Sequence, residues 1–453
     1  MKPSLAVVTS LLLVPQSALH AAAPAKPNII FILADDMGRG DLGCYGGQQT
    51  PTPRIDQLAN EGTRFTRYYS ASPICSPSRA GLLTGMFPAR CNITSYLQTR
   101  AGNRACEQED FLALTAPSLA RALKTAGYAT GHFGKWHLGG GRDVTNAPKF
   151  AAYGFDENAG TWESPEPHPD ITGGNWIWGP KDKVKRWNRT EFFVDKALDF
   201  FKRHKNQPGF VQIWLDDVHT PWVPDDHSPQ GDTPENFRPV LSEMDKQLGR
   251  LLDGVRELGI DHNTIIVFAS DNGALPTFHG ARAAGSRGSK LSLYEGGILL
   301  PFIVRWPGHL PAGRVDTTTV LAAVDLFPSL CAIAGAAAPA GATLDGEDLS
   351  GALLGKPAMR AKPLFWEYGR NGKSFNYPAP PDRSPNVAML DGKWKLLINA
   401  DGTAPELYDL ATDPNETKNL ADTQQDITTK MKSAALRWRS SMPKLMANNQ
   451  NKP

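Results

Sequence analysis

Short apolar strands alternate with amphipathic helices along most of this 453-residue chain. The strand-like runs are rich in β-branched residues and cover 27–33, 209–215, 263–269 and 302–306. Between them lie helical patterns at 53–62, 116–127, 191–204 and 235–259. This alternation predicts an α/β fold in which helices cover both faces of a large, mostly parallel sheet.

Polar side chains follow three of the predicted strands at the point where each strand ends. In a parallel sheet the carboxyl ends of the strands meet at one edge, and ligands bind there. Carboxylate and amide oxygens suit calcium or magnesium better than zinc. Taken singly, an acidic pair after a strand is more often a helix cap or a solvated turn. The residues at these three ends are Asp35, Asp36, Asp216, Asp217, His219, Asp271 and Asn272.

The charge balance excludes a broad basic surface. The chain has 48 basic and 46 acidic residues, which leaves a formal net charge of +2. We therefore expect no nucleic-acid partner, because that function usually requires an excess of lysine and arginine. Any anion that this protein binds must be held by a few local groups.

The first 23 residues have the pattern of a secretory signal peptide. Lys2 precedes an apolar run at 5–14, and small residues follow at 21–23. The apolar run is too short to span a bilayer, and no later segment qualifies, so we expect no integral membrane segment. The sequence thus predicts an exported protein, periplasmic or secreted. A buried N-terminal helix is the alternative interpretation.

The C-terminal part of the chain differs in character. After about residue 335 the sequence is rich in small residues, and strand-like runs then follow at 364–368, 388–398 and 406–410. A polar helix is expected from about 423 to 440. We interpret 24–355 as a catalytic domain and 356–453 as a small C-terminal α+β subdomain with an antiparallel sheet.

Cys75 is the cysteine whose surroundings most strongly suggest chemistry. The chain has five cysteines, an odd number that leaves at least one unpaired if the protein is exported, while Cys91 and Cys106 are close enough in sequence to close a short loop. Ser76 and Pro77 are typical of a capping residue and the first helical position. Cys75 is therefore expected just before a helix N-terminus, a position that favours an anion, with Arg79 about one turn along.

At these residues the sequence resembles a known family. Cys75, Pro77 and Arg79 match the Cys-x-Pro-x-Arg signature of the formylglycine-dependent sulfatases in the alkaline phosphatase superfamily, of the arylsulfatase and N-acetylgalactosamine-6-sulfatase kind. The similarity continues in family order from residue 27 to about 421. The matching blocks are NIIFILADDMGRGDLGCYGG, GHFGKWHLGG, the region of His219, FASDNG, KLSLYEGGILLPFIVRWPG, GKWKLL and ELYDLATDPNETKNLA.

The resemblance implies an alkaline phosphatase-like sandwich and a specific chemistry. A separate maturing enzyme oxidises the cysteine to formylglycine (3-oxoalanine), whose hydrate attacks sulfur and leaves a covalent sulfate on the enzyme. One calcium ion is implied, which polarises the nucleophile and a sulfate oxygen. The implied metal-site residues are Asp35, Asp36, Cys75, Asp271 and Asn272.

The resemblance also assigns roles to cationic residues. Arg79 resembles the residue that holds the formylglycine, Lys135 binds sulfate, and His137 is the base for release of sulfate. His219 and Lys290 match residues that contact sulfate and help to protonate the departing alcohol, and Asp271 is implied to draw the proton from the attacking hydroxyl. Lys135 and His137 lie two apart after a strand-like run, so both face one way if the chain stays extended. One further family position, a serine or histidine of the metal-site network, is assigned only as a guess to Ser164.

The predicted function is hydrolysis of sulfate monoesters, on sulfated carbohydrate or on aryl sulfates. A tryptophan-rich segment at 161–188 suits stacking on sugar rings, or alternatively covers the sheet. Arg370 and Lys373 either line the pocket or lie on a solvated loop. Two alternatives stay open: a phosphodiesterase or phosphonate monoester hydrolase of the same superfamily, and a non-catalytic binder of sulfated glycans in which Cys75 is not matured.

Overall fold

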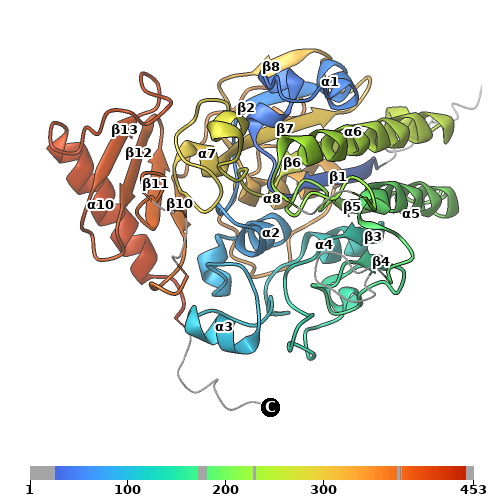
Figure 1. Ribbon diagram of the computed structural model, residues 1–453, viewed down its shortest axis with the longest axis horizontal. Coiled ribbons are helices and arrows are strands. Elements are labelled where there is room, and N and C mark those ends of the chain that lie inside the picture. The colour runs from blue at the N-terminus through green and yellow to red at the C-terminus, as the bar shows by residue number, and fades with distance from the viewer. Residues whose placement is uncertain (1–25, 172–180, 228–230, 375–377, 379, 445–453) are drawn as a thin grey trace, which may run out of the picture.

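A computed structural model describes residues 26–171, 181–227, 231–374, 378 and 380–444. The predicted signal peptide lies outside the described residues. A large sheet occupies the centre of the molecule and a smaller sheet packs at its side (Figure 1). Among the described residues, no helix combines the length and the apolar character needed to cross a bilayer.

The large sheet has nine strands in the order β4-β3-β5-β1-β6-β7-β2-β8, with β9 paired to β2. All pairs are parallel except those that β7 forms with β6 and β2, so the predicted mostly parallel sheet is confirmed. The strands are β1 (Asn28–Ala34), β2 (Thr63–Tyr69), β3 (Ala129–Gly134), β4 (Glu157–Gly160), β5 (Gly209–Trp214), β6 (Thr264–Ser270), β7 (Leu299–Arg305), β8 (Arg314–Asp316) and β9 (Leu321–Ala322).

Both faces of the large sheet are buried, as the continuous apolar strands require. Along β1, Ile29, Phe31 and Leu33 point into one core, and Ile30 and Ile32 point into the other. The second core is closed by α1 (Pro53–Asn60), α5 (Arg189–Arg203) and α6 (Pro234–Glu257). The first is closed by α2 (Cys75–Thr84), α4 (Leu119–Thr125), α8 (Leu326–Ala334) and α9 (Ser350–Leu353).

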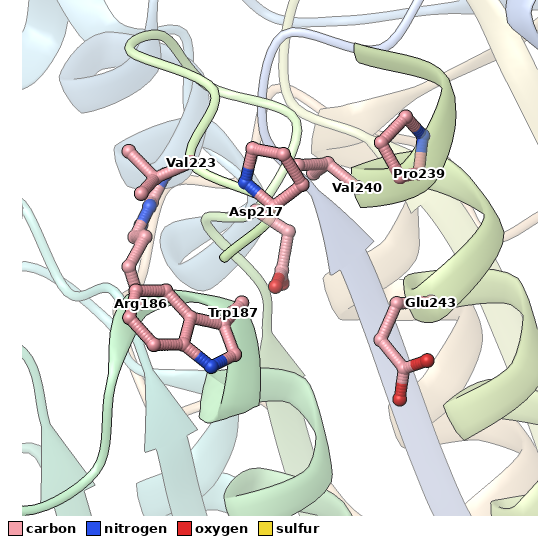
Figure 2. A pocket seen from close by; sticks show the side chains of 8 residues that line it. Arg186, Trp187, Asp217, Val223, Pro239, Val240 and Glu243 are labelled. Carbon is pink, nitrogen blue, oxygen red and sulfur yellow. The ribbon is translucent and has the colours of Figure 1, made fainter. Parts of the chain in front are cut away.

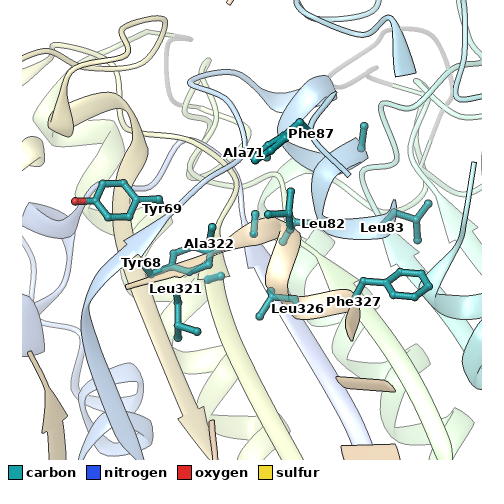
Figure 3. Packing of buried hydrophobic residues seen from close by; sticks show 14 of the residues in the cluster. Tyr68, Tyr69, Ala71, Leu82, Leu83, Phe87, Leu321, Ala322, Leu326 and Phe327 are labelled. Atoms are coloured by element: carbon teal, nitrogen blue, oxygen red, sulfur yellow. The ribbon is translucent and has the colours of Figure 1, made fainter. Parts of the chain in front are cut away.

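The helix that carries the Cys75 motif is anchored in the first core. All ten residues of α2 are buried. Figure 3 shows Leu82 and Leu83 of α2 beside Leu326 and Phe327 of the α8 segment, with Tyr68 of β2 in the same cluster. Because this packing fixes α2 along its whole length, the first turn of the helix is held firmly at the edge of the sheet.

The smaller sheet is antiparallel and continues the first core. Its strands are β10 (Leu364–Glu367), β11 (Val387–Asp391), β12 (Trp394–Ile398) and β13 (Glu406–Asp409), in that order. The helix α10 (Gln425–Ser440) packs across β10, β11 and β12 (Figure 1). The two remaining α-helices of the described residues are short: α3 (Arg100–Ala105) and α7 (Glu295–Ile298).

Two local expectations are wrong. The helix α2 begins at Cys75 with Ile74 as its N-cap, so Ser76 does not cap it. Pro77 is then the third helical residue, where its missing N–H is still one of the groups that have no intrahelical partner. The proposed pairing of Cys91 with Cys106 is also not formed, because all five cysteines are described and all are free thiols.

Candidate active site

Two neighbouring strands bring four predicted metal-site residues together. Ala34 at the end of β1 is paired in register with Ser270 at the end of β6. The residues that follow are in direct contact: the backbone N–H of Asp36 donates to Asp271 Oδ1 at 3.2 Å. Asn272 Nδ2 donates to Asp36 Oδ1 at 2.7 Å. The parallel register therefore places these side chains as the strand-end argument predicts.

Cys75 is the first residue of α2 and lies against the acidic pair. Its side chain is buried, and its Sγ is 3.4 Å from Asp35 Oδ1 and 3.5 Å from Lys135 Nζ. Burial and the charge of Asp35 raise the pKa of this thiol well above its ordinary value. The cysteine is thus held as a neutral thiol, which is a poor nucleophile and a poor metal ligand without further chemistry.

Arg79, one turn along α2, is fully buried and binds Asp271. Its Nε is 2.9 Å and its terminal nitrogen 2.8 Å from Asp271 Oδ2. A second terminal nitrogen donates to the carbonyl oxygen of Lys135 at 2.7 Å, and the guanidinium lies over the ring of Trp214. Burial and the neighbouring Asp35 raise the pKa of Asp271 to about 7, although Arg79 opposes the shift.

Two lysines approach the acidic pair from different segments. Lys135 Nζ is 2.6 Å from Asp35 Oδ2, and Lys290 Nζ is 2.6 Å from Asp36 Oδ2. Burial alone would raise the pKa of Asp35, but the positive charge of Lys135 lowers it well below its ordinary value. The structure therefore gathers three buried carboxylates, Asp35, Asp36 and Asp271, with three buried cations, Arg79, Lys135 and Lys290.

His219 faces the same acidic pair with one ring nitrogen. Its Nδ1 is 2.6 Å from the carbonyl oxygen of Thr220, so Nδ1 carries the hydrogen. Its Nε2 then has a lone pair that can accept from Lys290 Nζ at 3.4 Å, and it lies 3.7 Å from Asp36 Oδ2. Burial lowers the pKa of this imidazole to about 4, and the charge of Lys290 adds to the effect.

His137 is close to this cluster, but the chain does not stay extended there. The strand β3 ends at Gly134, and His137 has a positive φ of 54°. Gly134 is required because a Cβ at that position would lie 1.9 Å from the carbonyl oxygen of Trp214. His137 Nε2 is 3.0 Å from the carbonyl oxygen of Leu97. It is also 3.4 Å from Glu163, a buried residue that the sequence analysis did not identify.

Three other candidate residues bind partners outside the cluster around Cys75. Asp216 forms ion pairs with Arg186 and Arg189, and Asp217 accepts a hydrogen bond from Thr190. Figure 2 shows Asp217 in a small hollow, with Trp187 on one side and Glu243 of α6 on the other. Ser164 is buried, and its hydroxyl donates to the carbonyl oxygen of Thr161 at 2.7 Å.

The residues considered for substrate binding also differ in their burial and in the contacts that they make. Trp162 is half-buried beneath the guanidinium of Arg142, whereas Trp176 and Trp178 lie outside the described residues. Arg370 is largely buried and bonds to Asn92 Oδ1 at 3.1 Å, which is a structural contact. Lys373 is exposed on a loop.

The chemistry of the cluster fits a hard divalent cation. Ligand atoms of Asp35, Asp36, Cys75 and His219 lie within 4.8 Å of one another. Asn272 Oδ1 is buried and has no hydrogen-bond partner in the described part of the chain, which suits an oxygen that a cation would bind. Carboxylate and amide oxygens favour calcium or magnesium over softer metals.

Comparisons with known proteins agree with this geometry. The family model described as sulfatase matches residues 27–336, and one described as N-sulphoglucosamine sulphohydrolase, C-terminal, matches 289–440. The chain is 30% identical to an N-acetylgalactosamine-6-O-sulfatase of Bacteroides thetaiotaomicron, over 89% of this chain and 91% of that protein. It is 31% identical to human arylsulfatase A, over 91% of this chain and 86% of that protein.

A solved structure shows the same architecture. It is a protein labelled 6S-sulf, described in a study of the metabolism of multiple glycosaminoglycans by Bacteroides thetaiotaomicron. The TM-score is 0.75 and the sequence identity is 27%. The match covers 92% of this chain and 99% of that chain. The fold is therefore the alkaline phosphatase-like sandwich of the sulfatases. On the family model, the relatives and the fold together, this chain belongs to the sulfatase family and is a sulfuric ester hydrolase.

Proposed function

We propose that this sulfatase hydrolyses sulfate monoesters of carbohydrates, using residue 75 after oxidation of its cysteine to formylglycine. One observation carries the proposal: Cys75 begins a buried helix and lies within 3.5 Å of both Asp35 and Lys135. Its neutral, desolvated thiol is unsuited to attack on sulfur. A carbohydrate is proposed because the Bacteroides relative is named for a sulfated sugar.

The charge balance of the site supports an anionic ester as substrate. Three buried cations already balance three buried carboxylates. A divalent ion would add two positive charges, which suits a monoanionic sulfate ester on entry and a dianionic sulfate on release. Because the overall charge of the chain is only +2, this attraction is local to the site.

The chain's own residues position the reaction. The hydrated aldehyde supplies two hydroxyls: one attacks sulfur and leaves a covalent sulfate on residue 75, and the other becomes the aldehyde again as sulfate leaves. Arg79 and the first turn of α2 hold residue 75 in place. Lys135 and Lys290 lie where they can bind sulfate oxygens.

Proton transfer is assigned to three groups. Asp271, a buried carboxylate held by Arg79, is proposed to take the proton of the attacking hydroxyl. Lys290, which is protonated, is the proposed donor to the departing alcohol, and His219, whose Nε2 lies 3.4 Å from Lys290 Nζ, can help only after taking up a proton at Nε2. His137 is proposed as the base that accepts a proton when sulfate is released.

We propose calcium as the bound cation. Asp35, Asp36, Asp271 and Asn272 would hold it with oxygen ligands, and the oxidised side chain of residue 75 would complete the set. Bound there, the cation polarises the nucleophile and a sulfate oxygen. His219 Nε2 lies near enough to be a nitrogen ligand, but Lys290 competes for the same lone pair.

The decisive experiment changes residue 75. We expect Cys75→Ala to abolish turnover of an aryl sulfate and of N-acetylgalactosamine 6-sulfate, without loss of the cooperative unfolding transition. Cys331→Ala, which removes another buried thiol on α8, is the matched control and should keep its activity. Mass spectrometry of the active protein should find the aldehyde at residue 75; activity with an intact cysteine would refute the nucleophile.

Two alternatives give different results in the same assays. A phosphodiesterase or phosphonate monoester hydrolase would turn over an aryl phosphodiester or phosphonate faster than the aryl sulfate. A non-catalytic glycan binder would retain an unmodified Cys75 even when it is co-expressed with a sulfatase-maturing enzyme. We expect the sulfate ester to be the preferred substrate and maturation to be required.

We also propose that the protein is exported to the periplasm or secreted, after removal of residues 1–23, and that 24–355 and 356–453 are its two structural units. N-terminal sequencing of the mature protein tests the first proposal. Limited proteolysis tests the second, since cleavage near residue 355 should release two resistant fragments or a nicked complex.

A further inference from the structure

His137 and Glu163 contact each other just beyond the ends of two paired strands. Gly134 at the end of β3 is paired in register with Gly160 at the end of β4. His137 and Glu163 each lie three residues beyond these glycines. The backbone N–H of His137 donates to the carbonyl oxygen of Glu163 at 3.0 Å, and the His137 Nε2 atom lies 3.4 Å from Glu163 Oε2.

The contacts of His137 determine which ring nitrogen carries the hydrogen. Its Nε2 is 3.0 Å from the carbonyl oxygen of Leu97, and a carbonyl oxygen only accepts hydrogen bonds. Nε2 is therefore protonated in the neutral ring, and Nδ1 has the free lone pair. Nδ1 is buried and has no hydrogen-bond partner among the residues that the structure describes.

This histidine is tied to the first turn of α2. The backbone N–H of Leu97, whose carbonyl oxygen binds His137, donates to the hydroxyl of Ser76 at 2.9 Å. Ser76 is the neighbour of the proposed nucleophile at residue 75. His137 also lies two residues after Lys135, whose Nζ is 3.5 Å from Cys75 Sγ, and the positive charges of Lys135 and Arg79 act on the His137 ring.

Glu163 is held as a charged carboxylate. Its Oε1 accepts from Arg142 Nε at 3.2 Å and from a terminal nitrogen of Arg142 at 2.7 Å, so Oε2 stays available to His137. Burial opposes ionisation of Glu163, but neighbouring positive charges outweigh it and lower the pKa of the carboxyl: His137 when it is protonated, and Lys135 and Arg142. The side chain of Arg142 is 27% exposed and that of Glu163 only 5%, so the carboxylate acts from within the protein.

We propose that Glu163 is a positioning residue that orients His137 so that Nδ1, and not Nε2, acts as the base in sulfate release. This rests on the proposed function. In that step the proton of the second hydroxyl at residue 75 moves to Nδ1. The O–H electron pair becomes the second carbon–oxygen bond of the aldehyde, the bond between the residue 75 carbon and the sulfate oxygen breaks, and its electron pair leaves with the sulfate dianion. Glu163 stabilises the imidazolium that forms, because its carboxylate is adjacent to Nε2–H.

The first test is kinetic. We expect Glu163→Gln to lower kcat roughly 10- to 100-fold with KM nearly unchanged, because the charge matters only once His137 is protonated. The acid limb of the kcat profile should move to lower pH, since a carboxylate that favoured protonated His137 is gone. Lys135 and Arg79 remain, so the cations that act on the ring are unaltered. Glu166→Gln is the matched control: it removes a carboxylate three residues away that binds the Phe150 N–H, and it should leave kcat as in the wild type.

The second test does not depend on turnover. In protein labelled with ¹⁵N-histidine, the resonances lost in His137→Asn identify this ring, and they should show protonated Nε2 and unprotonated Nδ1. Glu163→Gln should shift them, and Glu166→Gln should not. A protonated Nδ1 in the neutral ring, or a wild-type kcat in Glu163→Gln, would overturn the inference.

The two proposals fail in different ways. The histidine spectra can be recorded on protein whose residue 75 is still cysteine. If Glu163→Gln shifts the His137 resonances but the matured wild-type protein has no sulfatase activity, the proposed reaction is refuted and the contact is supported. Normal turnover with no shift would refute the positioning role. A lower rate that merely follows a lower melting temperature, with an unchanged pH profile, would make Glu163 structural and also refute it.

Discussion

At the scale of single residues, the two histidines of the site differ in which ring nitrogen binds a backbone carbonyl. His219 donates from Nδ1 to the Thr220 carbonyl and presents Nε2 to Lys290, whereas His137 donates from Nε2 and leaves Nδ1 free. In each case a backbone carbonyl selects the tautomer. Each histidine thus uses one ring nitrogen to bind a backbone carbonyl, and the two rings use opposite nitrogens for this.

Asn272 allows a prediction about metal binding. The change Asn272→Ala removes the unpartnered Oδ1 and the hydrogen bond from Nδ2 to Asp36 Oδ1. We expect calcium affinity to fall by about 10-fold or more, because both a ligand and the orientation of its neighbour are lost. Calorimetric titration of apoprotein with calcium measures the change. Asn399→Ala, on a turn of the small sheet, is the control; equal affinities in the two variants would contradict the ligand assignment.

At the scale of elements, short 3-10 segments support the strand ends. The segments η1 (Arg39–Asp41) and η7 (Phe278–Ala283) are joined by Arg282, whose Nε lies 2.8 Å from Asp41 Oδ1. A terminal nitrogen of Arg282 donates to the carbonyl oxygen of Asp36 at 2.8 Å, and the guanidinium lies over the ring of Phe237. A buried ion pair thus fixes the backbone of a predicted metal ligand.

Breaking this pair should be costly. Arg282→Met leaves the Asp41 carboxylate buried without its cation, and we expect a loss of about 3–5 kcal/mol in the free energy of unfolding. The double change Arg282→Met with Asp41→Asn should recover much of the loss, because no unpaired charge remains buried. Urea unfolding measures both variants. Equal stability of the single and double variants would contradict the cost assigned to an unpaired buried carboxylate.

At the scale of the whole molecule, a buried charged network joins the two sheets. Lys395 on β12 is 2.7 Å from Glu295 Oε1 at the start of α7 and 2.9 Å from Glu416 Oε1, which follows β13. Tyr69 of β2 donates to Glu295 at 3.0 Å. One lysine cannot balance two buried carboxylates, and burial, with the nearby charge of Glu295, raises the pKa of Glu416 to about 7.

This network predicts a pH dependence of stability. A carboxyl whose pKa rises from 4.5 in the unfolded chain to about 7 in the folded protein binds its proton more tightly when folded. Its contribution is present in full below pH 4.5 and is lost as the pH rises through 7, on the order of 3 kcal/mol in all. Glu416→Gln should therefore flatten the stability profile between pH 5 and about 8. Chemical unfolding at several pH values checks this, and identical profiles for both proteins would contradict it.

Removal of the proposed calcium ion should act on the whole molecule as well. Binding to the folded state alone stabilises it by about 2.7 kcal/mol when free calcium is 100-fold above Kd. We expect chelation to lower the melting temperature and to abolish turnover, and added calcium to restore both. A chelated, metal-free protein with full activity would exclude the proposed role of the cation.

The sequence by itself determined most of the long helices and central strands and the edge at which the site lies. Apolar runs predicted β1, β5, β6 and β7, and helical spacing predicted α6, because these patterns depend only on a few neighbouring residues. The expected parallel sheet placed Asp35 near Asp271, because the carboxyl ends of parallel strands meet at one edge. The strand β2 was missed because Arg64 and Arg67 interrupt its apolar residues.

Only the tertiary structure decided which polar groups meet. The start of α2 depends on packing around Ile74, and the bend at His137 depends on the close approach of Gly134 to Trp214. The contact between His137 and Glu163 arises from the register of β3 with β4, a long-range pairing that no local pattern encodes. Local periodicity thus sets the elements, while register and burial set the chemistry, because hydrogen-bond partners are chosen only when distant strands are brought together.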